Sequence, residues 1–239
     1  MIIIPARIGS TRFANKVLAD IDGLPMVIKT AKAVSVVDRV AIATDSLEVL
    51  DIASTFGIEA VLTSNEHKSG TDRINEASHK LSLSSNEIIL NVQADEPFIE
   101  PEVVYALFEL TKKNISNPKI MINSCYKDIT HPEADDPNLV KVVTDIDEVA
   151  IYFSRAKIPY PRDHHFDGYK GHIGLYGFSK EMLNRFCQLP LSPLEEIEKL
   201  EQLRAIYSGY GVAMVKVETQ SFGIDTLEDL EKAKRLYIN

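Results

Sequence analysis

The amino-acid sequence predicts an α/β fold with a Rossmann-like, mixed but mainly parallel sheet, flanked by helices and extended by a small antiparallel part. Two observations predict it. Over about the first 118 residues, short apolar, β-branched runs alternate with amphipathic helical stretches. After that point, apolar runs follow one another without long helices between them. The 239 residues suit one domain, which these patterns divide into residues 1–118 and residues 119–239.

Residues 1–118 contain four predicted strand–helix pairs. Each helix returns the chain to the starting end of the sheet, so that successive strands run parallel. Polar loops at the carboxyl ends of those strands should then meet at one edge, where open α/β sheets bind their ligands. The predicted elements are strand 1–5, helix 25–34, strand 39–43, helix 47–56, strand 58–62, helix 71–81, strand 87–92 and helix 102–114.

Residues 119–239 contain mostly strands. These are predicted at 119–126, 140–144, 149–154, 172–178 and 212–217. A helix is predicted where Ser192 provides the N-cap, Pro193 the first helical residue and Glu195 the second half of a capping box. Thr226 begins a final helix. The apolar residues expected along these two helices are Ile197, Leu200, Leu203, Ile206 and Tyr207, and then Leu227, Leu230, Ala233 and Leu236 or Tyr237.

Composition argues against several classes of function. The net charge of −9 disfavours nucleic acid as a partner, because that binding needs a basic surface. No apolar run approaches the roughly 18 residues of a membrane span, so we expect no membrane insertion. The apolar start at residues 1–5 is short and lacks a basic region, so we expect no export and a cytoplasmic location. Cys125 and Cys187 are expected to be buried or free thiols.

The loop after the first strand is a candidate phosphate site. Residues 1–19 contain no Asp or Glu, whereas Arg7, Arg12 and Lys16 lie there. Small residues such as Ser10 let backbone N–H groups approach an anion, and the cations add charge. The loop matches neither a Walker A nor a GxGxxG motif, so on its own it also fits a solvated basic loop. Its place after the first strand favours the phosphate site.

Two carboxylates that follow short apolar runs are candidate magnesium ligands. Asp95 follows a predicted strand, and Mg²⁺ usually takes one or two protein carboxylates together with substrate phosphates. A turn residue or a helix cap explains Asp95 equally well. Asp225 could likewise only precede a capped helix, and the sequence does not show that the two carboxylates meet.

Three further polar positions have a structural and a functional interpretation. Residues 69–72 are interpreted first as the cap of the next helix. Glu201 lies beside an apolar stripe, where an unpaired carboxylate is costly, so it should be paired or functional. His172 begins an apolar strand, where a structural hydrogen bond is favoured over ligand binding.

Short motifs along the whole chain resemble those of the sugar-acid cytidylyltransferases, and in particular of their CMP-KDO synthetase branch (KDO is 3-deoxy-D-manno-octulosonate). Each motif alone is weak, but together and in order they are highly specific. The matching segments are IPAR at 4–7, STR at 10–12, KVL at 16–18, SGTDR at 69–73, NVQADEP at 91–97, NLVKVV at 138–143, YFSRA at 152–156, HIGLYGF at 172–178, LEEIEKLEQLR at 194–204 and GIDT at 223–226.

The resemblance implies a nucleotidyltransferase-type fold, a homodimer and a requirement for Mg²⁺. It implies transfer of CMP from CTP to the anomeric hydroxyl of KDO, which gives CMP-KDO and pyrophosphate for lipopolysaccharide biosynthesis. Residues 1–118 would bind the nucleotide, and residues 119–239 would bind the sugar acid and dimerise. By resemblance, the catalytic residues are Lys16, Asp95 and Asp225, of which the two aspartates hold the metal; the nucleotide-binding residues are Arg7, Ser10, Arg12, Lys16, Thr71, Arg73 and Gln93; and the sugar-acid-binding residues are Arg155, His172, Tyr176, Glu201 and Gln202.

Two positions depart from the family pattern. Ala94 replaces the usual Gly before Asp95, and Asn15 replaces Gly before Lys16. Ala is tolerated if its φ is negative, and Asn is the next-best residue at positive φ. We therefore expect activity to survive.

Three alternatives stay open. Another nucleotidyltransferase would use a different base or another sugar acid, such as neuraminate or an 8-amino KDO analogue. A nucleotide-sugar-dependent glycosyltransferase would carry a DxD-type metal motif, and the DEP sequence at 95–97 lacks its second Asp. A non-catalytic nucleotide-binding module is disfavoured because both Asp95 and Asp225 are present.

Overall fold

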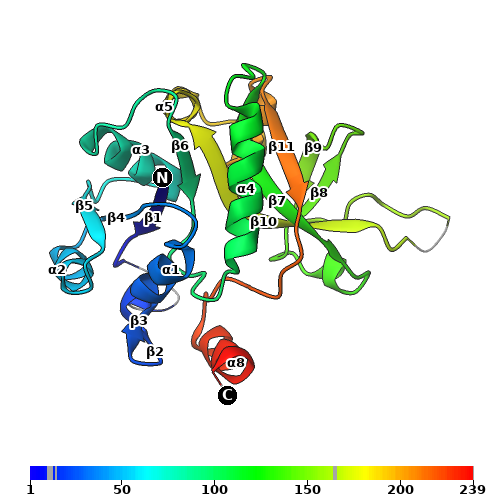
Figure 1. The fold of residues 1–239 in the computed structure, drawn as a ribbon. Helices are drawn as coiled ribbons and strands as arrows, with labels where there is room; N and C mark the ends of the chain where they lie inside the picture. Colours follow the sequence, from blue (N-terminus) through cyan, green and yellow to red (C-terminus); the bar gives the residue numbers. More distant parts are fainter. Residues whose placement is uncertain (10–12, 14, 164–165, 239) are drawn as a thin grey trace.

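The computed structural model describes residues 1–9, 13, 15–163 and 166–238. Its described part is built around a nine-stranded sheet whose main order is β11-β7-β10-β6-β1-β4-β5, with β8 and β9 attached beside β10 (Figure 1). The predicted α/β fold, with its mainly parallel part and its antiparallel extension, is confirmed. The sheet is continuous and takes strands from both residues 1–118 and residues 119–239.

The parallel part follows the predicted strand–helix alternation. β1 lies in the middle and pairs in parallel with β4 on one side and β6 on the other, and β4 pairs in parallel with β5. Predicted and observed bounds differ by at most one residue. The elements are β1 (Ile2–Ala6), α1 (Met26–Val34), β4 (Val40–Thr44), α2 (Leu47–Thr55), β5 (Glu59–Leu62), α3 (Gly70–Lys80), β6 (Ile88–Asn91) and α4 (Pro101–Asn114).

The antiparallel part begins at β10, which lies between β6 and β7 and runs antiparallel to both. β11 pairs in parallel with β7, and β8 pairs with β9 and with the start of β10. This arrangement joins the late strands to the early sheet along one long strand. The bounds are β7 (Ile120–Ile129), β8 (Lys141–Thr144), β9 (Ala150–Ser154), β10 (Tyr169–Ser179) and β11 (Gly211–Lys216).

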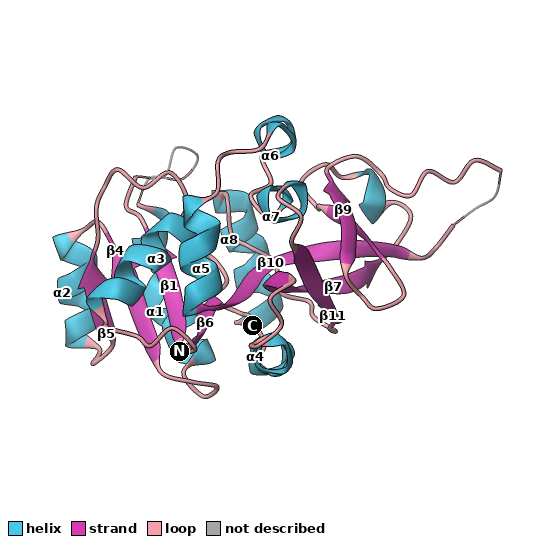
Figure 2. Ribbon diagram, turned by 90° about the horizontal axis from the view of Figure 1, so that it is seen from above, coloured by secondary structure: helices cyan, strands magenta, loops and turns pink. Residues whose placement is uncertain are grey.

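The core is divided between the two faces of the sheet, because side chains alternate along each strand. Figure 2 shows helices on both sides of the sheet. In β1, Ile2 and Ile4 pack with apolar residues of α1, α2 and α4, whereas Ile3 packs on the other face with residues of α3 and α5. Gly177 in β10 allows α4 to pack closely on the sheet, because a Cβ there would collide with the side chain of Thr111 on α4. The helices therefore cover both faces and leave the carboxyl ends of β1 and β6 accessible to ligands.

The prediction of a single helix after Ser192 is wrong, because the chain forms two short helices there. The chain forms α6 (Pro193–Glu198), turns at Lys199 in the left-handed conformation with φ 56°, and resumes in α7 (Leu203–Tyr207). The Ser192 side chain caps α6 as predicted, but the Glu195 carboxylate binds Arg204 instead of completing the capping box. Of the predicted stripe, Leu200 and Leu203 are buried, Ile206 is half-buried, and Ile197 and Tyr207 are exposed.

The final helix, α8 (Leu227–Tyr237), begins with a complete capping box between Thr226 and Asp229. Leu230 and Ala233 are buried as predicted. Leu227 is exposed, and its predicted place in the apolar stripe is therefore wrong. Five elements were not predicted. They are η1 (Lys16–Leu18), the hairpin of β2 (Asp20–Ile21) and β3 (Leu24–Pro25), η2 (Glu133–Asp135) and α5 (Lys180–Gln188).

No helix in the described ranges is both long enough and apolar enough to cross a membrane.

Candidate active site

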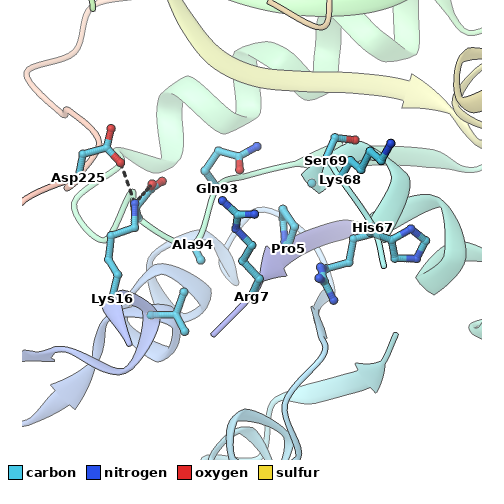
Figure 3. A pocket seen from close by; sticks show the side chains of 13 residues that line it. Pro5, Arg7, Lys16, His67, Lys68, Ser69, Gln93, Ala94 and Asp225 are labelled. Carbon is cyan, nitrogen blue, oxygen red and sulfur yellow. Dashed lines mark hydrogen bonds and ion pairs between the residues drawn. The ribbon is translucent and has the colours of Figure 1, made fainter. Parts of the chain in front are cut away.

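A cavity of about 300 Å³ lies at the carboxyl ends of β1 and β6 (Figure 3). This is the edge of the sheet at which the sequence predicts that the polar loops meet. Cations and carboxylates dominate its wall. It is lined by Pro5, Arg7, Lys16, Val17, His67, Lys68, Ser69, Gly70, Arg73, Gln93, Ala94, Asp95 and Asp225.

The side chain of Lys16 contacts both predicted metal ligands, and Figure 3 shows it beside Asp225. Its Nζ lies 2.6 Å from Asp95 Oδ2 and 2.9 Å from Asp225 Oδ1. Burial alone would lower the pKa of Lys16, but the charges and hydrogen bonds of Asp95 and Asp225 outweigh it and raise the pKa. The ammonium is therefore charged at neutral pH, and the two carboxylates converge on one cation.

Neither carboxylate caps a helix. Asp95 lies in the turn after β6, and α4 begins later, with Glu100 at its N-cap position. Asp225 directly precedes the N-cap of α8, which is Thr226. The helix-cap interpretation of Asp95 is therefore wrong, whereas its turn interpretation and the placement of Asp225 directly before a capped helix are confirmed.

A backbone hydrogen bond holds the two loops together. Ile224 N–H donates to Asp95 O at 2.9 Å, which places Asp225 beside the loop that follows β6. Glu96 lies behind Asp95 and accepts a hydrogen bond from Ser221 Oγ at 2.9 Å. Burial, together with the neighbouring Asp95 charge, raises the pKa of Glu96 to about 8.

The predicted nucleotide-binding residues divide into three groups. Arg7 and Gln93 line the cavity, as does Arg73. Thr71 is fully buried, and its hydroxyl donates to Glu201 Oε1 at 2.5 Å. Ser10 and Arg12 lie outside the residues that the structure describes.

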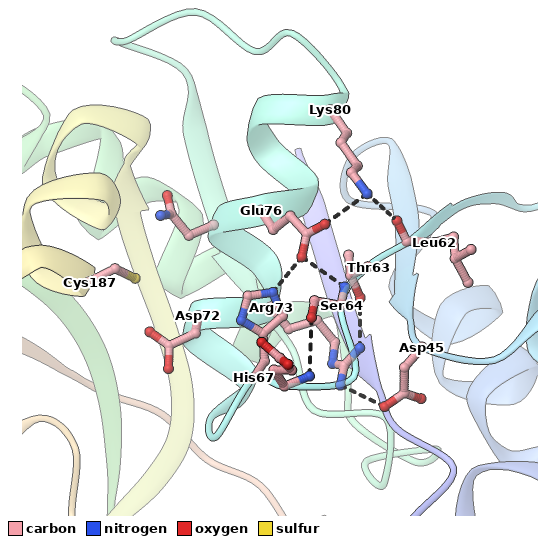
Figure 4. Close-up of polar contacts among 12 residues, drawn as sticks. Asp45, Leu62, Thr63, Ser64, His67, Asp72, Arg73, Glu76, Lys80 and Cys187 are labelled. Atoms are coloured by element: carbon pink, nitrogen blue, oxygen red, sulfur yellow. Dashed lines mark hydrogen bonds and ion pairs between the residues drawn. The ribbon is translucent and has the colours of Figure 1, made fainter.

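The guanidinium of Arg73 is held by two partners (Figure 4). It donates to Thr63 Oγ1 at 2.6 Å and to Asp45 Oδ2 at 2.8 Å. The side chain is buried, so this ion pair fixes the wall of the cavity between β4 and α3. The cap interpretation of residues 69–72 is confirmed, because the Ser69 hydroxyl accepts a hydrogen bond from Asp72 N–H at the start of α3.

Four of the predicted sugar-acid residues form a second cluster, next to Thr71. Tyr176 Oη donates to Gln202 Oε1 at 3.0 Å. Gln202 Nε2 and Glu201 Oε2 are buried without a hydrogen-bond partner among the described residues. The His172 ring lies against the Tyr176 ring, with 5.7 Å between their centroids.

The sheet brings the cavity residue Gln93 close to the second cluster. Gln93 Nε2 donates to Asn91 Oδ1 at 3.1 Å, and Asn91 lies opposite Tyr176 in the sheet. Burial raises the pKa of Glu201 to about 7, although the hydrogen bond from Thr71 opposes that shift. The unpartnered carboxylate oxygen and amide nitrogen are suited to a ligand that carries several hydroxyl groups.

His172 and Arg155 both make structural contacts. The His172 Nε2 lies 2.9 Å from Ser124 Oγ, and burial lowers the pKa of His172 to about 3, so the ring is neutral. Arg155 donates from Nε to Glu198 O at 2.8 Å and from Nη1 to Pro137 O at 3.0 Å. The structural hydrogen bond predicted for His172 is confirmed, and Arg155 lies at the end of α6 rather than in the cavity wall.

Residues 1–219 match the family model described as cytidylyltransferase. This chain belongs to the cytidylyltransferase family. Its curated relatives include 3-deoxy-manno-octulosonate cytidylyltransferases from Nitratiruptor (58% identical, covering 97% of both chains) and Wolinella succinogenes (51% identical, covering 99% of both). A solved CMP:2-keto-3-deoxy-manno-octonic acid synthetase complexed with CTP superposes with a TM-score of 0.91 at 38% identity, covering 99% of this chain and 97% of that one.

As a cytidylyltransferase, the chain is a nucleotidyltransferase with an α/β fold shared by more distant relatives. A Leptospira borgpetersenii cytidylyltransferase, 14% identical, superposes with a TM-score of 0.64 over the whole of this chain and 87% of that one, and shows the fold alone.

The cytidylyltransferase cavity also contains residues that the sequence did not single out. His67 and Lys68 line it just before the cap of α3, and the His67 ring is held by the Glu76 carboxylate. Lys68 adds a cation to the wall. Lys68 could have been predicted from the sequence, because it directly precedes the SGTDR segment and a cation beside a motif residue is a candidate for the same site.

Both departures from the family pattern are accommodated. Asn15 has φ 53° and ψ 31°, the left-handed conformation that Asn tolerates better than most residues. Ala94 is not among the described residues with positive φ, and its carbonyl accepts a hydrogen bond from Thr30 Oγ1 at 2.9 Å. Glycine is therefore not required at the position before Lys16 or at the position before Asp95.

Proposed function

We propose that this cytidylyltransferase transfers CMP from CTP to the anomeric hydroxyl of KDO, releasing pyrophosphate and supplying CMP-KDO for lipopolysaccharide biosynthesis. The observation that carries the proposal is the 58% identity, over 97% of both chains, to a 3-deoxy-manno-octulosonate cytidylyltransferase. The cavity supports it, because Lys16, Arg7 and Lys68 provide positive charge for a triphosphate beside two carboxylates.

Mg²⁺ fits the donor set at this site. Asp95 and Asp225 already converge on the ammonium of Lys16, so their oxygens are placed to share one cation. Mg²⁺ favours hard oxygen ligands and usually completes its coordination with water and substrate phosphates, so two protein carboxylates suffice. When bound, Mg²⁺ would supply charge neutralisation at the triphosphate.

The residues of the chain would mainly position the reactants and balance their charge. The anomeric hydroxyl attacks the α-phosphorus of CTP while pyrophosphate leaves in line with it. Lys16 would exchange its carboxylate contacts for phosphate oxygens as negative charge develops on the leaving group. Arg7 would hold the phosphates from the end of β1, and Gln93 would orient the substrates between cavity and second cluster.

The second cluster would bind the sugar acid. Glu201 Oε2 and Gln202 Nε2 need partners, and a hydroxylated sugar provides both a donor and an acceptor. The neutral ring of His172 would contribute a hydrogen bond rather than a charge. Arg155 would bind the carboxylate of the sugar acid only if its guanidinium left the carbonyls of Glu198 and Pro137.

We also propose a homodimer and a cytoplasmic location. β9 pairs with β8 on one side, and Ile151 on β9 is 56% exposed. Tyr160, in the connection that follows, is 82% exposed. A second copy of the chain would cover these apolar side chains. Light scattering at micromolar concentration should give twice the monomer mass, and a monomer mass would contradict the dimer.

A pyrophosphate-release assay tests the activity. Purified protein with Mg²⁺, CTP and KDO should release pyrophosphate and form CMP-KDO, whereas omission of KDO should stop the release. GTP or ATP in place of CTP should give little turnover, and equal turnover would contradict the cytidine assignment. Faster reaction with neuraminate or an 8-amino KDO analogue would reassign the sugar acid.

A further inference from the structure

Residues 217–226, here called the strap, join β11 to α8 and carry Asp225 to the cavity. In Figure 1 this segment leaves the end of β11 and passes close to the start of α4 before it reaches α8. None of its residues belongs to a strand or helix. The position of Asp225 therefore depends on the hydrogen bonds that hold the strap to its neighbours.

One of those contacts comes from Glu100, the residue before the first turn of α4. Its carboxylate accepts hydrogen bonds from the Thr219 hydroxyl and from Gln220 N–H, the latter at 3.1 Å. Glu100 occupies the N-cap position of α4 but makes no side-chain capping bond to that helix. Its hydrogen-bonding capacity is directed to the strap.

The strap is then held at successive points up to Asp225. Ser221 donates to Glu96, and Ile224 N–H donates to Asp95 O. From the last residue of α8, Tyr237 Oη also donates to Gln220 O in the strap, at 2.8 Å. Glu100 does not line the cavity, and unlike Glu96 it is not adjacent to Asp95. A substitution of Glu100 therefore leaves the residues of the cavity wall unchanged.

We propose that Glu100 is a positioning residue that fixes the strap and so holds Asp225 against Asp95 and Lys16. Two hydrogen bonds to one carboxylate restrain two consecutive strap residues, and charge-assisted bonds are about twice as strong as neutral ones. A displacement of about 1 Å in a catalytic group can lower a rate by about 100-fold. The inference rests on the proposed role of Asp225 in catalysis.

The first experiment compares Glu100→Ala with Glu102→Ala, a matched loss of charge at an exposed position in the first turn of α4. Glu100→Ala should lower kcat about 10-fold, as expected for loss of hydrogen bonds to a charged group. Glu102→Ala should stay within about twofold of wild type. Glu100→Gln keeps a carbonyl acceptor and should recover part of the loss.

The second experiment places Glu100→Ala in an Asp225→Asn background. If Glu100 acts through Asp225, its replacement should lower the residual kcat of that background by no more than about twofold. The same 10-fold loss in both backgrounds would overturn the inference, as would wild-type kcat in the single variant.

Hydrogen exchange provides a readout that does not require activity. In Glu100→Ala, the amides of Gln220 and Ile224 should exchange faster, while amides of β1 and β6 keep their wild-type rates. Unchanged exchange along the strap would overturn the inference even if the protein used another substrate. Failure of the proposed function would instead appear as absence of CMP-KDO synthesis by the wild type, with the exchange difference intact.

Discussion

The ammonium of Lys16 lies within hydrogen-bond distance of both Asp95 and Asp225, at 2.6 Å and 2.9 Å. It comes from the short helix η1 after the first strand, whereas the two carboxylates come from the turn after β6 and from the strap. Three segments that are separate in the sequence thus meet at the ammonium of Lys16. Any cation that replaces Lys16 there encounters two carboxylates already placed to bind it.

The first prediction follows from that convergence. Asp95→Asn and Asp225→Asn should both fold, because neither side chain caps a helix, and each should lose activity by about 100-fold or more, because a neutral amide is a poor ligand for Mg²⁺. Pyrophosphate release measures activity, and thermal unfolding checks the fold. Asp147→Asn, at an exposed turn, is the control.

The double variant adds a second criterion to this prediction. Because the first substitution already breaks the site, the second should cost much less than it does alone. Near-normal turnover of either single variant at saturating Mg²⁺ would remove that residue from the metal site.

The second prediction concerns the buried ion pair that links α6 to α7. Arg204 donates to Glu195 from Nε at 2.8 Å and from Nη2 at 2.5 Å, and the two side chains are 7% and 11% exposed. Glu195→Ala leaves the guanidinium buried and uncompensated, which should lower the free energy of unfolding by about 3–5 kcal/mol. Urea unfolding measures the loss.

The neighbouring Glu196 is exposed and provides the matched control for this pair. Glu196→Ala should change the free energy of unfolding by no more than about 1 kcal/mol. Replacing both partners with apolar residues, Glu195→Leu with Arg204→Met, should be less harmful than Glu195→Ala alone. Equal stability of the two Ala variants would refute the structural role of the pair.

The third prediction compares two glycines of β10. A Cβ at Gly177 would collide with the Thr111 side chain, which donates a hydrogen bond to Leu107 O at 2.7 Å, and would lie 3.2 Å from Leu90 Cδ2. Gly177→Ala should therefore destabilise the protein by about 1–3 kcal/mol. A Cβ at Gly174 meets nothing within 4 Å, so Gly174→Ala should be nearly neutral. Thermal unfolding of the two variants should rank them in this order, and the reverse order would contradict the packing of α4 on β10.

The fourth prediction is a dependence of stability on pH through Glu201. Burial raises its pKa to about 7 from the ordinary 4.5, so the folded protein holds a proton that the unfolded chain has released. Stability from this group is therefore present below about pH 4.5 and is lost as pH rises through about 7. Glu201→Gln removes that loss, so the variant should gain stability over wild type between pH 5 and pH 8.

Urea unfolding of both proteins at pH 5, 6, 7 and 8 provides the test. Other titrating groups, such as Glu96 and His172, are present in both proteins, so the difference isolates Glu201. A constant difference across this range, or a difference that shrinks with pH, would contradict the raised pKa.

Sequence reasoning recovered the parallel half of the fold because that half has strong periodicity and clear helix starts. It missed α5, whose buried residues are only Leu183 and Phe186 and whose sequence is otherwise polar. It merged α6 and α7 because Lys199 gives no Gly or Pro signal for a turn. The pairing of Glu195 with Arg204 spans this turn, and no local pattern predicts it.

Part of the site was predictable from the strand pattern of the parallel half. Strand ends identify Arg7, Gln93 and Asp95, because parallel strands bring their carboxyl ends to one edge. Asp225 arrives on an irregular segment, so only the family resemblance placed it near Asp95. The Thr71–Glu201 bond was also hidden, since it joins the first turn of α3 to the turn between α6 and α7.

The position of β10 has a consequence for the order in which the molecule is assembled. Translation makes β6 and β7 before β10, yet β10 is the strand that fills the space between them. Until Tyr169–Ser179 has emerged from the ribosome, the inner edges of β6 and β7 have unpaired N–H and C=O groups, and such edges are templates for association with other chains. Completion of β10 therefore closes both inner edges at once, whereas the other edge of β7 stays unpaired until β11 is made.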